Sequence, residues 1–314
     1  MFNHLKIGVF ILVFSIPFMI FGVNLNSQRI LRLSKGNYFF EKTRNSPDIS
    51  EIIISFPNKN KISIVKKGDL WHIKEADDYY ASFLKINTLV SLIRNTIIYR
   101  ADIIKNNKLS VDTKNSIKMT SIDKSGNHVD EATIIPINDG NKHHYALLNN
   151  DNFLYQISGD FNISSNAIDW LQMPLLKILA KEIKEIKCDK FHLYKRFSDD
   201  LFVNVGTNKT VNYVDSFINN LWYLSADKVY HSVNFKRNEY QRLQTYEIKL
   251  FNGIIYIISF YKKGKEIVIN IKLDKDLLMS KDGIKWLDEN RVLYDGWFFS
   301  IPPMVGEVLI NYTI

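Results

Sequence analysis

The chain has 314 residues, 46% hydrophobic and 24% charged, which excludes wholesale disorder and is long enough for two core-bearing domains. Its single cysteine, Cys188, excludes an intramolecular disulfide, a cysteine-based metal cluster and a lipoprotein anchor near the N-terminus. The net charge of +8 is spread along the chain without a strongly basic patch, which argues against nucleic-acid binding.

The N-terminus carries an uncharged apolar run at residues 7–23. As a helix rising 1.5 Å per residue, this run spans about 26 Å, which is enough to cross a hydrocarbon core. A cleaved signal peptide is the alternative because Pro17 lies inside the run, but no small-x-small cleavage pattern follows it. The sequence therefore predicts a retained membrane anchor in residues 1–26, whose apolar residues include Ile7, Phe10, Leu12, Phe14, Phe18, Phe21 and Val23.

The orientation of this anchor has two interpretations. Several basic residues follow the apolar run, and the positive-inside rule would then place the bulk of the chain in the cytoplasm. A short N-terminal tail before such a run is instead typical of a signal anchor, which leaves the C-terminal part outside. We favour the second interpretation and expect a single-pass inner-membrane protein with periplasmic domains.

Residues 27–49 are expected to form a juxtamembrane linker, and residues 50–180 a first domain. From Glu51 to Lys74, apolar residues alternate between turn residues, which predicts antiparallel hairpins. Near-helical apolar spacing over residues 82–98 predicts one amphipathic helix packed across them. Further strands follow between turn-forming segments, and a short helix is expected to begin at Ser164 and to close this domain.

Residues 181–314 repeat this order and are expected to form a second domain. Two hairpin strands precede a helix near residues 211–224, and both helices lead to an Ala-Asp pair, at residues 101–102 and 226–227. The sequence predicts an α+β fold, in which the transmembrane helix precedes two tandem units, each an antiparallel sheet with one helix. Tandem duplication is the economical explanation, and chance recurrence of a common strand-strand-helix order is the alternative.

Four short patterns in the chain carry a family resemblance: W-x-I at residues 71–73, Y-x-A at 79–81, Asp169-Trp170, and L-L-x-I at 175–178. With the N-terminal membrane helix, these patterns resemble the bacterial family of domain of unknown function 4340 over roughly residues 50 to 230. The resemblance implies an envelope role beside components of an ABC-type transporter. It supplies no catalytic residue.

Candidate chemical sites are few. The adjacent His143 and His144 are the most metal-like pair, but neighbouring strand residues point to opposite faces and cannot grip one ion together. Two Asp-Asp pairs, at residues 77–78 and 199–200, fall in predicted turns, where aspartate favours local backbone hydrogen bonds. Neither a nucleophile elbow nor a glycine-rich phosphate loop occurs. We therefore expect no catalytic residue, no metal and no cofactor.

The C-terminal stretch groups three aromatic residues before a Pro-Pro pair: Trp297, Phe298 and Phe299. They are interpreted either as core residues of a final edge strand or as an apolar patch that docks a partner. Two function classes follow. The first is a membrane-anchored, non-catalytic envelope protein that binds a partner, as an accessory subunit of an ABC-type transport complex. The second is an anchored enzyme or ligand sensor acting in the cell envelope.

Overall fold

A computed structural model of the chain describes residues 36–46, 48–103, 115–135, 143–149, 153–173, 175–277, 279 and 281–314. The expected anchor at residues 7–23 lies outside these residues. Within the described part, no helix is both long and apolar enough to cross a membrane. Contacts divide the chain into two units: the described residues of Met1–Asp69 with Leu84–Ser165, and Leu70–Phe83 with Asn166–Ile314.

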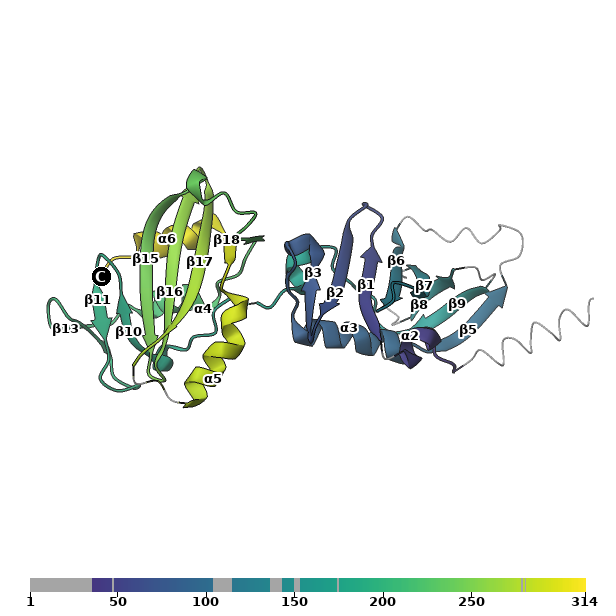
Figure 1. Cartoon of the computed structure of the whole chain (residues 1–314), viewed down its shortest axis with the longest axis horizontal. Helices are drawn as coiled ribbons and strands as arrows, with labels where there is room; N and C mark the ends of the chain where they lie inside the picture. Colours follow the sequence, from purple (N-terminus) through teal and green to yellow (C-terminus); the bar gives the residue numbers. More distant parts are fainter. Residues whose placement is uncertain are drawn as a thin grey trace, which may run out of the picture. The chain divides into compact units, whose positions relative to one another are not determined.

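The first sheet has nine antiparallel strands in the order β4-β3-β2-β1-β6-β7-β8-β9-β5 (Figure 1). The strands are β1 (Ile49–Ser55), β2 (Lys61–Lys67), β3 (Leu70–Ile73), β4 (Tyr79–Tyr80), β5 (Ile98–Ile103), β6 (Ile117–Asp123), β7 (His128–Ile135), β8 (His143–Leu148) and β9 (Phe153–Ser158). Two α-helices accompany them, α2 (Glu41–Asn45) and α3 (Phe83–Asn95), with a 3-10 turn η1 (Lys74–Ala76) between β3 and β4.

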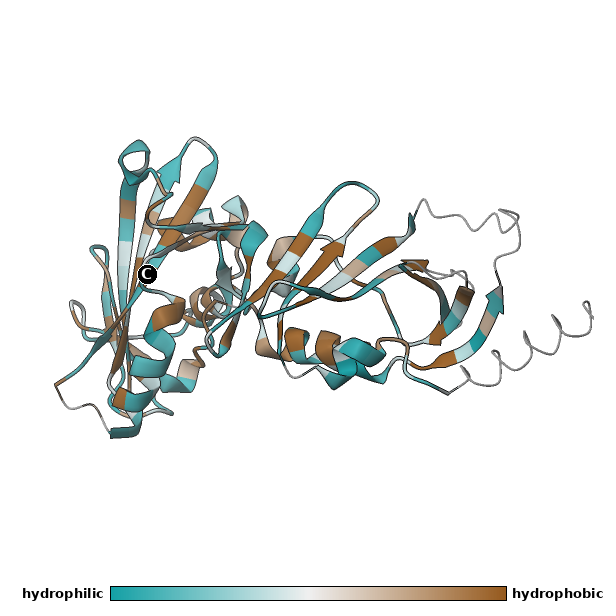
Figure 2. Ribbon diagram, turned by 45° about the vertical axis from the view of Figure 1, so that its right-hand side comes forward, coloured by the Kyte–Doolittle hydropathy of each residue, from teal (hydrophilic) through white to brown (hydrophobic). Residues whose placement is uncertain are grey.

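Alternating isoleucines form the core of this sheet. Ile52 pairs with Ile64 and Ile54 with Ile62 across β1 and β2, and all four side chains are buried. Because side chains alternate between the faces of a strand, this register places one apolar row on one side of the sheet. The alternation appears as coloured bands along the strands in Figure 2.

The second sheet also has nine antiparallel strands, in the order β13-β12-β11-β10-β15-β16-β17-β18-β14. The strands are β10 (Ile183–Lys187), β11 (His192–Tyr194), β12 (Phe202–Asn204), β13 (Lys209–Val211), β14 (Lys228–His231), β15 (Gln241–Leu250), β16 (Ile254–Lys263), β17 (Glu266–Lys275) and β18 (Trp297–Ile301). Its helices are α4 (Asp215–Trp222), α5 (Lys281–Asn290) and α6 (Pro303–Asn311), with short 3-10 turns η3 (Ala167–Trp170), η4 (Ala180–Glu182), η5 (Arg237–Glu239) and η6 (Arg291–Leu293).

The two sheets have the same strand order. In each, the first strand is central, the second to fourth extend to one edge, the sixth to ninth extend the other way, and the fifth closes that edge. A helix lies between the fourth and fifth strands in both, α3 and then α4. The expectation of two tandem sheet units is therefore confirmed. The structure is mostly β with few helices, so an α+β description overstates the helical part.

Individual positions of the repeat match unevenly. Leu193 pairs with Ile186 as Ile64 pairs with Ile52, and all four are buried. Phe202 is buried, whereas Trp71 is only half-buried, and Ile73 is the buried residue of β3. The prediction of a helix beginning at Ser164 was wrong. The segment forms only one 3-10 turn, η3, after which Leu171 forms a β-bridge with Ala81.

Three helices lie against one face of the second sheet. Phe217 of α4 contacts Tyr246 with ring centroids 4.9 Å apart, and the Tyr246 hydroxyl donates a hydrogen bond to the carbonyl of Leu309 in α6. Gly306 lets α6 approach β17 closely, since a Cβ atom there would lie 2.8 Å from the Ile267 side chain. We call this the helix-covered face, and the opposite side of β15–β18 the open face.

Candidate functional site

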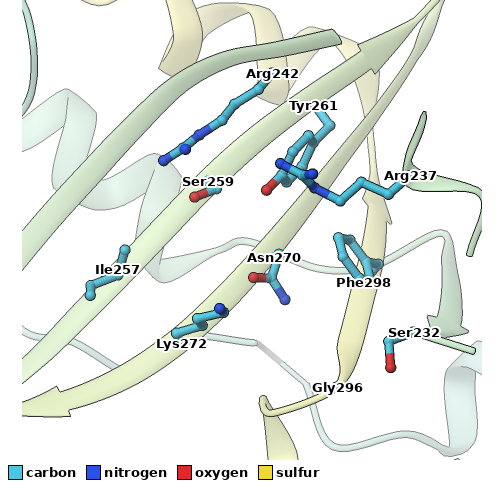
Figure 3. A pocket seen from close by; sticks show the side chains of 10 residues that line it. All are labelled: Ser232, Arg237, Arg242, Ile257, Ser259, Tyr261, Asn270, Lys272, Gly296 and Phe298. Carbon is cyan, nitrogen blue, oxygen red and sulfur yellow. The ribbon is translucent and has the colours of Figure 1, made fainter. Parts of the chain in front are cut away.

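The open face of the second sheet holds a hollow of about 570 Å³. Its lining comes from β15 to β18, from the loop between β14 and β15, and from Gly296 just before β18, and Figure 3 shows the side chains on one side of the strands. The ten lining residues are Ser232, Arg237, Arg242, Ile257, Ser259, Tyr261, Asn270, Lys272, Gly296 and Phe298. We call this set the basic hollow.

Strand register assembles the hollow from residues far apart in sequence. Ser259 on β16 pairs with Asn270 on β17, which pairs with Phe298 on β18. Ile257 pairs with Lys272 in the next row. Paired residues on neighbouring strands point to the same face of a sheet, so these side chains share the open face.

A bulge in β15 brings Arg242 to the same face. The register shifts between Arg242 and Gln244, so that Arg242 pairs with Tyr261. The guanidinium of Arg242 then donates hydrogen bonds from Nε and Nη2 to Thr245 Oγ1, at 3.1 and 2.7 Å. A β-bulge commonly redirects a side chain in this way.

The floor of the hollow is neutral and buried. Ser259, Tyr261, Asn270 and Phe298 are each exposed by 5–8%. Asn270 is oriented by a 2.8 Å hydrogen bond from Nδ2 to the carbonyl of Trp297. A buried amide held by a backbone group keeps one geometry, so the floor is a preformed polar surface.

Three exposed cations surround this floor: Arg237, Arg242 and Lys272. The guanidinium of Arg237 lies over the ring of Tyr261, 5.0 Å from its centroid. No acidic group in the described part of the chain forms an ion pair with any of the three. Lys249 on the same sheet is instead paired with Asp276 at 2.5 Å. The lining of the basic hollow therefore carries a net positive charge without direct ion-pair partners among the described residues.

Aromatic packing holds the loop that forms one wall of the hollow. Phe235 in this loop stacks on Phe298, with ring centroids 4.1 Å apart and an interplanar angle of 22°. Phe235 belongs to a small cluster with Tyr261 and Val268, against which Tyr230 and Tyr240 pack. The loop is thus fixed to the open face by apolar contacts.

Asp77 holds the start of the same loop. Its carboxylate accepts hydrogen bonds from the His231 backbone N–H, at 2.5 Å, and from Asn234 Nδ2, at 2.7 Å. All three residues belong to the second contact unit. Asp77 adopts a φ of 58°, a left-handed conformation that aspartate tolerates in turns. The Asp-Asp pair at residues 77–78 therefore contributes a positioning carboxylate.

Glu266, the first residue of β17, binds both the edge strand β14 and the end of the loop between β14 and β15. It accepts hydrogen bonds from the hydroxyls of Tyr230, at 2.9 Å, and Tyr240, at 2.7 Å. Burial acts to raise the pKa of Glu266, but the hydrogen bonds from Tyr240 and Tyr230 outweigh it and lower this pKa below its usual value. Burial and the hydrogen bond to Glu266 raise the pKa of Tyr230 to about 12.

These pKa shifts predict a pH dependence of stability. The folded-state pKa of Glu266 is lowered, so its contribution is complete above its unfolded pKa of about 4.3 and is lost as the pH falls through the folded value. The contribution of Tyr230 is complete below about pH 10 and is lost as the pH rises towards about 12. We expect Glu266→Gln to lower the free energy of unfolding near neutral pH by about 1–2 kcal/mol.

Urea unfolding between about pH 3 and about pH 7 tests this prediction, because the variant should lose part of the acid dependence of the wild type. Glu289→Gln is the control, because Glu289 is exposed and its one ion pair, with Lys285, is a long surface contact of 3.9 Å. Identical acid profiles for Glu266→Gln and the wild type would contradict the assigned role of Glu266.

The three C-terminal aromatic residues fall on different faces of β18. Trp297 and Phe299 lie beside Tyr79, with ring centroids 4.9 and 5.5 Å away, and Phe298 forms part of the floor of the hollow. All three are buried, and β18 is an interior strand between β17 and β14. Their rings are therefore packed inside the unit and offer little surface to a partner.

The other candidate residues from the sequence analysis take part in packing or in local hydrogen bonds. His144 is buried, and its Nε2 accepts a hydrogen bond from the Phe161 backbone at 3.3 Å. Asp200 accepts a hydrogen bond from the backbone of Phe197 within its turn. Cys188 is a half-buried free thiol. Among the described residues, no group of three or more histidine, cysteine or acidic side chains converges on a point.

Sequence reasoning missed the basic hollow. The available signal was the pattern of polar residues inside the apolar strands, such as Asn270 in the run IVINIK. Alternation places Asn270 and Lys272 on one face of a strand, but it does not say which residues of β15 and β16 lie beside them. Arg237 has no strand pattern at all, because it comes from the loop.

Comparison of the chain with protein-family models, with curated proteins and with solved structures finds no match. The fold and the hollow alone therefore define the class of this protein. It is a tandem antiparallel-sheet protein with a basic hollow on the open face of its second sheet.

Proposed function

We propose that this chain is a membrane-anchored, non-catalytic envelope protein that binds a partner protein, as an accessory subunit of an ABC-type transport complex. Residues 7–23 hold it in the inner membrane, and the two sheet units lie outside the cytoplasm. The apolar N-terminal run supports the anchor, and the resemblance to the bacterial family of domain of unknown function 4340 supports the transport role.

Tandem duplication accounts for the two units in this proposal. The shared strand order and the matching pairs Ile52 with Ile64 and Ile186 with Leu193 support it. A duplicated sheet provides two similar scaffolds, of which one copy is free to acquire a binding surface. The basic hollow lies on the second copy.

The observation that carries the binding role is the composition of the basic hollow. Its ten lining residues include three cations and four neutral polar side chains, but no carboxylate, imidazole or thiol. The serine, tyrosine and lysine side chains that are present act in catalysis mainly when a neighbouring base or charge activates them, whereas arginine, tyrosine and phenylalanine are enriched in protein interfaces. This lining favours recognition over chemistry.

Site-specific photo-crosslinking in cells tests the proposal. A photoreactive phenylalanine analogue at Ser232, an exposed residue that lines the hollow, should crosslink to an integral membrane subunit of a transporter. The same analogue at Ser216 is the matched control, because Ser216 is exposed on α4, which packs on the helix-covered face.

Two results would contradict the proposal. One is equal crosslinking from both positions, which would indicate random collision. The other is purification of the chain alone in mild detergent without any crosslink from Ser232. If Ser232 forms a crosslink to no protein, or only to a small metabolite-processing enzyme, the result favours the enzyme or sensor class instead.

A further inference from the structure

Two cations of the basic hollow, Arg242 and Lys272, are attached far apart on the sheet. Arg242 pairs with Tyr261, which pairs with Val268, so Arg242 lies two strands away from β17. Lys272 lies four residues beyond Val268 on β17. Strand spacing and residue rise place the two backbone positions roughly 17 Å apart.

Arg237 approaches from a third side. It projects from the loop between β14 and β15, while Arg242 and Lys272 stand on the sheet (Figure 3). An extended peptide covers roughly 17 Å with about five residues. Acidic side chains at alternate positions of such a peptide point to the same side and reach separate cations.

The hollow is also bounded by negative charge. Glu247 pairs with Ile257 in the same row as Lys272, and Asp274 pairs with Ile255 in the next row, so both exposed carboxylates lie on the open face. Like charges repel at this range, so a long uniform polyanion running across the sheet would meet these carboxylates. A short acidic segment fits within the positive area alone.

We infer that the basic hollow binds a short, extended, acidic segment of the partner protein, whose carboxylates pair with Arg237, Arg242 and Lys272. This inference rests on the proposed partner-binding function and names the chemistry of the partner. Half-buried Ile257, next to Lys272, provides an apolar surface beside the carboxylate that pairs with Lys272. Asn270 and Ser259 supply neutral polar contacts from the floor.

Fluorescence anisotropy with the full-length chain in mild detergent tests the inference. The probe is a fluorescein-labelled hexapeptide of alternating glutamate and leucine, and the control probe has glutamine in place of glutamate. We expect the acidic probe to bind about ten-fold more tightly than the glutamine probe and to weaken as salt is raised. Equal binding of the two probes, or no binding of the acidic one, overturns the inference.

Matched charge reversals locate the binding. The double variant Arg242→Glu with Lys272→Glu should weaken binding of the acidic probe about ten-fold or more. The control double variant Lys209→Glu with Lys265→Glu makes the same change of net charge at exposed positions outside the hollow, and it should change affinity by less than about two-fold. An equal loss in both overturns the inference, because the attraction would then be general.

Glutamine substitutions at Arg242 and Lys272 provide a milder pair of variants if the charge reversals disturb folding, and they should also weaken binding of the acidic probe.

Inorganic pyrophosphate, a single-stranded oligothymidylate and anionic phospholipid vesicles serve as competitors. Displacement of the acidic probe by any of them at equal charge concentration overturns the peptide assignment. If the acidic probe fails while Ser232 still crosslinks to a transporter subunit, the inference is wrong but the proposed function stands.

Discussion

Removing residues 1–26 is expected to transfer the chain from the membrane fraction to the soluble fraction. The apolar run at residues 7–23 is the only uncharged stretch in the sequence long enough to span a bilayer. Central apolar residues of a membrane helix contribute about −0.3 to −0.6 kcal/mol each, so the run provides several kcal/mol of insertion free energy. Fractionation of cells followed by a high-salt wash measures the change.

Deleting residues 2–5 is the matched control, because it removes part of the N-terminal tail and leaves the apolar run intact. That variant should stay in the membrane fraction. If the chain lacking residues 1–26 still sediments with membranes after the wash, the single-anchor prediction is wrong. A reporter active only outside the cytoplasm, fused to the C-terminus, tests orientation separately, and its silence in the presence of full-length fusion would indicate a cytoplasmic domain.

Phe299→Ala is expected to be the most destabilising single substitution among the three C-terminal aromatic residues. Phe299 is fully buried on the helix-covered face, and its ring lies 5.5 Å from that of Tyr79. Truncating such a side chain removes apolar burial and leaves a cavity, which costs about 3–5 kcal/mol. For a unit of this size, the thermal midpoint of the second sheet should fall by roughly 10 °C.

Thermal unfolding of the full-length protein in mild detergent measures this effect. Leu277→Ala is the control, because Leu277 is 100% exposed and its truncation should change stability by less than about 0.5 kcal/mol. A loss below about 1 kcal/mol in Phe299→Ala would contradict the packing described for β18. Loss of partner crosslinking from Phe299→Ala without loss of stability would return this residue to the docking interpretation.

The order of the elements was predictable from the sequence. Alternating apolar residues and turn chemistry indicate the strands, as in the hairpin at Asn252-Gly253, where Gly253 has a φ of 90°. The helix expected at residues 82–98 corresponds to α3, and that expected near 211–224 corresponds to α4. Helices α5 and α6 were not expected, because both are short, α5 has few apolar positions and α6 is apolar at most positions, so neither gives a clear helical period.

The sequence by itself determined the local elements of this protein, the repeat of their order and the apolar N-terminal run. Only the tertiary structure decided which side chains meet. Pairing across the three strands β15, β16 and β17, and a bulge at Arg242, bring Arg242, Asn270 and Lys272 to one face. A shift of one residue in any of these pairings would turn that strand's side chains to the opposite face, and the bulge at Arg242, which is not set by a turn, depends on how β15 packs in the sheet.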